Sequence, residues 1–192
     1  MSTPAIIEKT SEGVQRYAIQ DVMLQRREID CVGEIDRESV HDIILQLRYL
    51  QSLDDSQEIT LYVNSPGGGV DDGLALIDAM AGLRCPIRTV CIGMAASMGA
   101  LIFASGDKRD IMPHARVMIH DPLIKGGVGG SALKLDAVAR NMMKARETIA
   151  RILASRTGHT LEEVYEKTAD DTYFDAQEAL EWGLADRVIH EI

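Results

Sequence analysis

The sequence predicts an α/β fold built around a mainly parallel β-sheet. Short β-branched segments alternate along the chain with segments whose apolar residues recur at helical spacing. Two strand segments, 59–63 and 87–92, run through a glycine-containing turn into a helical segment, which is the connection that joins parallel strands. With 192 residues, 46% of them hydrophobic, the chain is long enough for a substantial core. We therefore expect residues 1–192 to form a single domain.

The first part of the chain changes from an irregular arm to regular elements. Residues 1–34 show no clear period, and we interpret them as an arm followed by one strand. Asp36 is a candidate helix N-cap, and the apolar residues that follow at helical spacing predict an amphipathic helix over 40–53. The β-branched segment 59–63 then predicts the first clear strand.

A glycine-rich loop follows this strand. We expect the strand to end abruptly at residues 64–69, and apolar spacing predicts a helix over 70–80. A strand, a glycine loop and a helix are typical of phosphate binding, but a dinucleotide pattern would need glycine in place of Asp72. The carboxylates of Asp71 and Asp72 would also repel phosphate. We interpret the glycines as letting backbone N–H groups approach a ligand, with a plain turn as the alternative.

The next unit places a serine where a strand turns into a helix. Segment 87–92 reads as a buried strand and segment 100–106 as a short buried helix, and Ser97 lies in the small-residue turn between them. A serine on such a turn exposes its hydroxyl, and the next backbone N–H can face a developing negative charge. The usual nucleophile turn begins with glycine, whereas Ala95 occupies that position here. A turn that is packed tightly for steric reasons is the alternative interpretation.

The rest of the chain continues the alternation of strands and helices. Segment 115–120 predicts a strand that closes with His120, and a glycine-rich link at 125–130 precedes a long apolar stripe over 135–153. That helix either projects and buries its stripe on a partner chain, or packs in the core. The remaining prediction is a helix that starts near 161, a loop at 170–174, a helix over 176–182 and a strand over 186–192.

Composition and charge exclude several classes of function. A net charge of −10 and a pI near 4.9 argue against a nucleic-acid interface, which needs a basic surface. Cys31, Cys85 and Cys91 form no CxxC pair, which predicts buried structural thiols in a reducing compartment. The sequence shows no charged-then-apolar leader at Met1 and no apolar run of membrane-spanning length. We therefore expect a cytoplasmic protein without a membrane association.

The residues able to do chemistry gather at one edge of the expected sheet. Sites in parallel sheets lie at the carboxyl ends of strands, and Gly68, Ser97 and His120 all fall at such ends. Acyl transfer by serine needs a nucleophile, a base, a carboxylate that orients the base, and two oxyanion donors. Ser97 and His120 could supply the first two, and the N–H of Met98 with one N–H of the glycine loop could supply the donors.

The residues alone do not determine which side chain supplies the orienting carboxylate. The candidates are Asp121, Asp170 and Asp171. Asp121 is disfavoured because it neighbours His120, and consecutive strand residues point to opposite faces. Spacing alone does not separate Asp170 from Asp171.

Three blocks of sequence together resemble the ClpP family, the proteolytic subunits of Clp proteases. Residues 63–68 (VNSPGG) are similar to the family's oxyanion loop, and residues 93–100 (GMAASMGA) are similar to its nucleophile block. Residues 116–123 (RVMIHDPL) are similar to its histidine strand. The resemblance extends over about residues 36–188 and implies the crotonase-like ClpP fold.

The resemblance implies a serine endopeptidase. It implies Ser97 as the nucleophile, His120 as the base and Asp171 as the orienting carboxylate. It implies the backbone N–H groups of Gly68 and Met98 as the oxyanion donors, with no metal and no bound cofactor. The implied substrate contacts are Gly69, Val70, Pro122 and Leu123.

The resemblance also implies an assembly. In the family, two stacked heptameric rings enclose the active sites and cleave unfolded proteins that an AAA+ unfoldase such as ClpX, ClpA or ClpC delivers. The partner would use ATP and would dock near Tyr62. Residues 1–20 would form an axial arm, and residues from about 123 to 158 would form a projecting handle, which favours the projecting interpretation of the long helix.

Several positions depart from the family pattern. Asp121 stands where Gln usually follows the histidine, and Ala169-Asp170 stand where an Asp-Arg pair often links the rings. One alternative is therefore a non-catalytic or partner-dependent subunit of a mixed ring, with weak activity on its own. The less favoured alternative is a crotonase-like acyl-CoA enzyme, which shares the fold and the glycine-loop donors but uses carboxylates as acids and bases.

Overall fold

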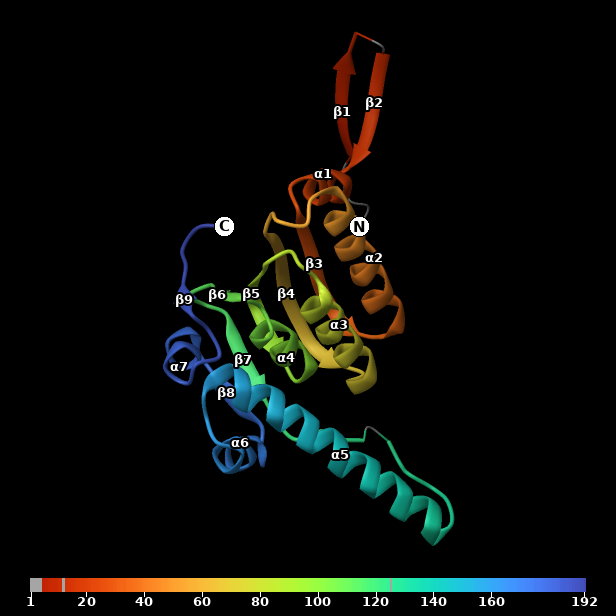
Figure 1. The fold of residues 1–192 in the computed structure, drawn as a ribbon, viewed down its shortest axis with the longest axis vertical. Helices are drawn as coiled ribbons and strands as arrows, with labels where there is room; N and C mark the ends of the chain where they lie inside the picture. Colours follow the sequence, from red (N-terminus) through yellow and green to blue (C-terminus); the bar gives the residue numbers. More distant parts are fainter. Residues whose placement is uncertain (1–4, 12, 125) are drawn as a thin grey trace.

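The structure, a computed structural model, describes residues 5–11, 13–124 and 126–192 (Figure 1). Helices and strands alternate along most of the chain. The helices among these residues are α1 (Ile19–Gln25), α2 (Arg37–Leu53), α3 (Val70–Gly82), α4 (Met98–Ala104), α5 (Ala132–Thr157), α6 (Leu161–Thr168) and α7 (Ala176–Glu181). The strands among them are β1 (Ala5–Thr10), β2 (Gly13–Ala18), β3 (Glu28–Ile35), β4 (Ile59–Gly68), β5 (Ile87–Ala96), β6 (Lys108–Ile111), β7 (Arg116–Ile119), β8 (Thr172–Phe174) and β9 (Arg187–Val188).

The main sheet is largely parallel, as the sequence predicts. Its strand order is β3-β4-β5-β6-β9, and β7 pairs with β5 and β8. The single antiparallel pairing described in this sheet joins β7 to β8. Two strands pair with successive parts of β5. Its first half pairs with β6, and Met94–Ala96 pairs with β7. The end of β5 therefore lies beside β7, which brings two of the predicted site residues to the same place.

The first 35 residues contain more regular structure than the arm and single strand that we expected. Strands β1 and β2 form an antiparallel hairpin that stands away from the body of the molecule (Figure 1). Helix α1 connects the hairpin to β3, the first strand of the main sheet. The hairpin is not signalled by periodicity because exposed side chains predominate in β2, so an alternation of buried and exposed positions does not develop.

Other boundaries also differ from the predicted ones. Strand β4 continues through the glycine loop to Gly68, because residues Glu34 and Ile35 of β3 pair with Gly67 and Gly68. The expected loop at 170–174 contains strand β8, and the final strand is limited to Arg187–Val188. Short strands of this kind are defined by the neighbours with which they pair, so local sequence does not reveal them.

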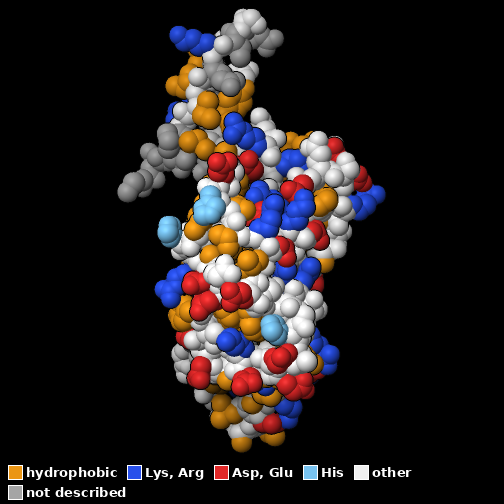
Figure 2. Space-filling view, turned by 90° about the vertical axis from the view of Figure 1, so that its left-hand side faces the viewer, with side chains coloured by type: hydrophobic (Ala, Val, Ile, Leu, Met, Phe, Trp, Pro, Cys, Tyr) orange, Lys and Arg blue, Asp and Glu red, His pale blue; other side chains and the backbone are white. Residues whose placement is uncertain are grey.

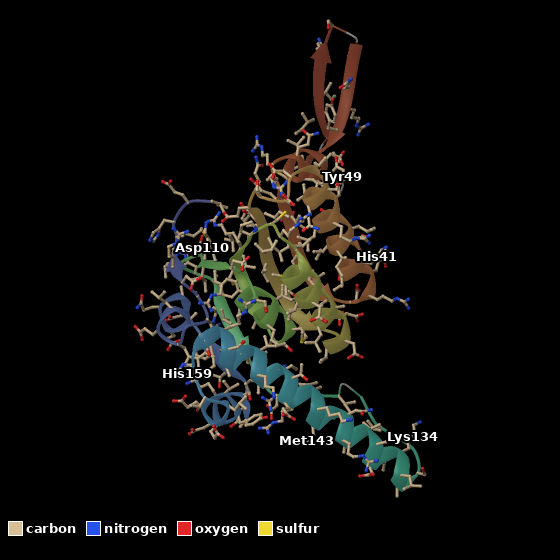
Figure 3. All side chains as sticks on the ribbon, viewed as in Figure 1. His41, Tyr49, Asp110, Lys134, Met143 and His159 are labelled. Carbon is tan, nitrogen blue, oxygen red and sulfur yellow. The ribbon has the colours of Figure 1, made fainter. Side chains whose placement is uncertain are left out.

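Helix α5 projects from the body, in agreement with the projecting interpretation (Figure 1). Its buried residues, Ile149, Ala150 and Leu153, all lie near its C-terminal end. The labelled residues Lys134 and Met143 lie on the projecting part (Figure 3). Figure 2 shows hydrophobic side chains at both ends of the elongated molecule, on the hairpin and at the lower tip. Among the described residues, no helix combines the length and apolar character needed to cross a membrane.

The three cysteines are free and buried, as predicted. Burial raises the pKa of the Cys31 and Cys91 thiols to about 12. Both side chains therefore stay protonated at neutral pH and are poor nucleophiles.

A buried carboxylate ties together one edge of the sheet. Asp110 lies on β6 with its side chain fully buried, near β9 in Figure 3. It accepts hydrogen bonds from Arg88 of β5 at 2.6 Å and from Arg187 of β9 at 2.9 Å. Burial raises the pKa of Asp110, but the hydrogen bonds from Arg187 and Arg88 outweigh it and hold that pKa below its usual range. The ionised form is therefore the one that stabilises these three strands.

Asp110→Asn is expected to lower the free energy of unfolding at pH 7 by roughly 3 kcal/mol, the low end for a broken buried ion pair. We expect the low end of this range because the Arg187 side chain is 62% exposed, and water weakens its pairing with Asp110. Since the folded pKa is depressed, this stabilisation is present above pH ~3.9 and is lost as the pH falls further. Urea unfolding at one protein concentration, from pH 7 to pH 3, tests both points.

The control is Glu58→Gln, which removes the more exposed pair between Lys108 and Glu58. It is expected to change the free energy of unfolding by about 0–1 kcal/mol. An Asp110→Asn variant with the wild-type dependence of stability on acid pH would contradict the assignment of this component to Asp110.

Candidate active site

Ser97 lies on a strained turn between β5 and α4. Its backbone adopts φ 53° and ψ −123°. Among the described residues other than glycine, Ser97 and Arg27 alone have a positive φ. The N–H of Ser97 donates a hydrogen bond of 2.8 Å to the carbonyl of Met118 on β7, which holds the turn in place. A positive φ is costly for a residue with a Cβ and marks sites where a side chain must be aimed. The turn therefore has the strained strand-to-helix geometry in which a nucleophilic serine can be presented.

The glycine loop packs directly against this turn. A Cβ placed on Gly67 would lie 2.6 Å from the Cβ of Ser97 and 3.1 Å from the backbone nitrogen of Met98. A Cβ on Gly68 would lie 2.0 Å from the carbonyl oxygen of Ile35. Side chains are therefore excluded at both positions, and backbone atoms of the loop can approach the serine.

Two backbone N–H groups near Ser97 fit the predicted role of oxyanion donors. Met98 is the first residue of α4, and the first N–H groups of a helix have no acceptor within the helix. In the loop, the N–H of Gly69 donates to Ile35 at 2.7 Å, so this N–H is already engaged. Gly68 is thus better suited than Gly69 to donate to a ligand.

His120 contacts Ser97 through its ring. The distance between His120 Nε2 and Ser97 Oγ is 2.9 Å, which is a hydrogen bond. The sheet register accounts for this contact, because Ala96 pairs with Met118, and Ser97 and His120 follow directly after the last residues of β5 and β7. The His120 side chain is 12% exposed, so most of the ring is shielded from water.

Asp171 contacts the other ring nitrogen of His120. The distance from His120 Nδ1 to Asp171 Oδ1 is 3.0 Å. Strand β8 runs antiparallel to β7, with Thr172 opposite Ile119, so Asp171 and His120 lie side by side where the pairing ends. The Asp171 side chain is 60% exposed, unlike the ring that it contacts.

The structure also separates the three candidate carboxylates. Asp170 lines a different surface pocket, together with His159 and Trp182. The Asp121 carboxylate is bonded to Arg146 and Thr168. Among these aspartates, Asp171 is the one whose carboxylate is hydrogen-bonded to the His120 ring. Strand pairing thus places Asp171, rather than Asp121 or Asp170, at the His120 ring.

A cleft of about 320 Å³ opens beside Ser97 and His120. All four residues named as substrate contacts line it, and so do both suggested oxyanion donors. The sequence reasoning missed Glu34, Pro66, Leu101 and Ile149, which also line the cleft. Leu101 could have been found, because it lies four residues after Ser97 and so on the same face of the helix. Ile149 carries no local signal, because it comes from the distant helix α5.

Tyr62 lies outside this cleft, on the middle of β4, opposite Asp30 of β3. At about 3.3 Å per residue along a strand, it lies roughly 20 Å from Gly68. Partial burial and the nearby charge of Glu28 raise the pKa of its hydroxyl, so Tyr62 stays neutral at physiological pH.

The geometry provides the elements needed for nucleophilic attack by a serine. A hydroxyl, an imidazole and a carboxylate form one chain of hydrogen bonds, and backbone donors and an apolar cleft lie beside it. One comparison with known proteins bears on this site. The model of the family described as Clp protease matches residues 10–192, which includes every residue of the chain of hydrogen bonds.

Proposed function

Because the chain belongs to the Clp protease family and is therefore a Clp-type peptidase, we propose that it is a serine endopeptidase. In this proposal Ser97 is the nucleophile, His120 is the general base and Asp171 orients His120. The observation that carries it is the pair of hydrogen bonds made by the two ring nitrogens of His120, at 2.9 Å to Ser97 and 3.0 Å to Asp171.

The proposed reaction begins with Ser97 Oγ attacking the carbonyl carbon of a peptide bond. His120 Nε2 takes the hydroxyl proton, while Asp171 accepts a hydrogen bond from Nδ1–H and stabilises the imidazolium that forms. The N–H groups of Met98 and Gly68 bind the oxyanion. His120 then donates its proton to the leaving amine, and water hydrolyses the acyl-enzyme by the same steps.

The cleft beside Ser97 supports an apolar substrate side chain next to the cleaved bond. Val70, Leu101, Leu123 and Ile149 contribute aliphatic walls, and Gly69 and Pro122 leave room for the substrate backbone. An apolar side chain would be favoured by the area that it buries, at ~25 cal/mol per Å². We infer that unfolded protein segments, which expose such side chains, are the substrates.

The family implies an oligomeric protease assembly in general, and we propose two stacked heptameric rings for this chain. The support is the large apolar surface that the single chain leaves uncovered on α5, where Leu133 is 81% exposed and Met143 is 60% exposed. Such a surface is normally buried on a partner. We also propose that a separate AAA+ unfoldase docks near Tyr62 and uses ATP, and that the assembly works in the cytoplasm on unfolded proteins.

A partner-dependent subunit of a mixed ring is the second candidate. It is favoured by the 60% exposure of Asp171, since a carboxylate in contact with water holds the imidazole less firmly. A neighbouring subunit could cover this residue and strengthen the contact. The crotonase-like alternative receives no such support, because its chemistry does not use a serine hydroxyl bonded to histidine.

The test combines the particle mass of the purified chain with labelling by a fluorophosphonate and cleavage of a fluorogenic peptide. The proposal expects label on Ser97, located by peptide mapping, and peptide cleavage that the label abolishes. Labelling and cleavage that appear only after a paralogue is added would establish the partner-dependent candidate. A folded particle that never labels at Ser97, with or without the paralogue, would overturn the serine mechanism.

A further inference from the structure

Asp121, the residue directly after His120, is bonded on both of its carboxylate oxygens. Arg146 of α5 donates from Nε to Asp121 Oδ2 at 2.5 Å, and the Thr168 hydroxyl donates to Oδ1 at 2.8 Å. The Asp121 side chain is 33% exposed, so it lies partly under these partners. The catalytic scheme above does not use any of the three side chains.

Thr168 joins Asp121 a second time through the backbone. The N–H of Asp121 donates to the carbonyl of Thr168 at 2.7 Å. Thr168 is 2% exposed and ends α6, three residues before Asp171. Two hydrogen bonds therefore join the segments that carry His120 and Asp171, in addition to the β7–β8 pairing and the contact between the His120 ring and Asp171.

Arg146 connects this junction to the long helix. Its guanidinium lies 4.1 Å from the centre of the Tyr165 ring on α6, which is close enough for a cation–π contact. The Arg146 side chain is 26% exposed, whereas Arg151, which pairs with Glu147 further along α5, is 63% exposed. The Asp121–Arg146 pair is thus better shielded than the surface pair on the same helix, and shielded pairs are stronger.

These bonds of Asp121 add to the β7–β8 pairing in holding the contact between His120 and Asp171. That contact is a single hydrogen bond to a carboxylate that is 60% exposed, and water competes for an exposed carboxylate. A displacement of about 1 Å in a catalytic geometry can cost roughly 100-fold in rate. Bonds between the two backbone segments limit that displacement more effectively than one solvent-exposed contact does.

We propose that Asp121 is a positioning residue, which uses Thr168 and Arg146 to hold the segments of His120 and Asp171 at the separation that catalysis requires. This inference rests on the proposed function. The three side chains act through His120 and Asp171 and do not touch the substrate.

The sharpest test compares two substitutions of the same buried side chain. Thr168→Val keeps the shape and removes the hydroxyl, whereas Thr168→Ser keeps the hydroxyl and removes a methyl group. Both are expected to lower Tm by a few degrees. Only Thr168→Val is expected to lower kcat for a fluorogenic peptide, by roughly 10-fold or more, with KM within about 2-fold of wild type.

A second set of variants tests the charge pair. Asp121→Asn and Arg146→Met are each expected to lower kcat roughly 10-fold, and the double variant is expected to be no slower than either one, because both break the same link. Arg146→Lys, which keeps the charge, is expected to recover part of the loss. Glu147→Gln is the matched control, since it breaks an exposed pair on the same helix and is expected to leave kcat unchanged.

All variants are compared at equal particle mass, with the rate of fluorophosphonate labelling of Ser97 as an independent readout. If kcat follows Tm, so that Thr168→Ser and Thr168→Val lose activity equally, the residues are merely structural and the inference is wrong. Additive effects of Asp121→Asn and Arg146→Met would also overturn it. Failure of the proposed function is distinguishable, because wild-type protein would then not label at Ser97.

Discussion

Ser97→Ala is expected to lower kcat for peptide cleavage by a factor on the order of 10⁴ or more and to abolish labelling by a fluorophosphonate. The reason is that alanine has no oxygen to attack the peptide carbonyl, and the apolar cleft holds no equivalent nucleophile in the proposed scheme. The substitution leaves the strained backbone unchanged, since serine and alanine both carry a Cβ at φ 53°. Peptide turnover and particle mass, measured on the same preparation, provide the test.

Folding and assembly of Ser97→Ala are expected to survive. The hydroxyl that is lost makes one hydrogen bond, to His120, and such a bond contributes about 1 kcal/mol to stability. Ser105→Ala is the matched control, because Ser105 lies at the other end of α4 and its hydroxyl is bonded only within that helix end. It is expected to retain wild-type turnover. A Ser97→Ala particle of normal mass that still cleaves peptide at the wild-type rate would refute the assignment of the nucleophile.

Asp171→Asn is expected to lower kcat by roughly 1,000-fold. Asparagine can present an amide N–H to the His120 ring in place of a carboxylate oxygen, so the ring is no longer held with its proton on Nδ1, and the imidazolium loses its partner. We expect the smaller end of the effects seen for such residues, because Asp171 is 60% exposed and water can replace part of its contact. Peptide turnover and the rate constant of Ser97 labelling should fall together.

The adjacent Asp170 offers an unusually close control. Asp170→Asn makes the same chemical change one residue away, on a side chain that lines another pocket with His159 and Trp182. It is expected to keep turnover within about 3-fold of wild type, as is usual for a surface substitution outside the site. Equal losses in the two variants would show that general negative charge, rather than contact with His120, explains the effect.

The residues near Ser97 were predictable because their signals are local. A β-branched run, a turn of small residues and an apolar helix follow one another within 20 residues, and this order specifies a serine on a strand-to-helix turn. The placement of His120 could be inferred for the same reason, because it closes a strand and the carboxyl ends of parallel strands share one edge. The blocks that resemble the ClpP family are these local segments.

The choice of carboxylate could not be made from the residues alone. Asp171 reaches His120 because β8 pairs with β7 in a register that places Thr172 opposite Ile119. The sequence of a three-residue strand is too short to indicate which strand it pairs with or in which register. The same limit applies to the network around Asp121, where Arg146 and Thr168 come from two later helices. Long-range pairing, rather than local propensity, completes the site.

The pairing of β7 with β8 also sets the order in which the proposed catalytic residues come together during synthesis. Ser97 and His120 both precede β8 in the chain, so Asp171 is the last of the three proposed catalytic residues to be synthesised. A nascent chain therefore lacks the proposed orienting carboxylate until the segment around β8 has been made. In the proposed mechanism, the three residues are brought together only after β8 has been made and has paired with β7.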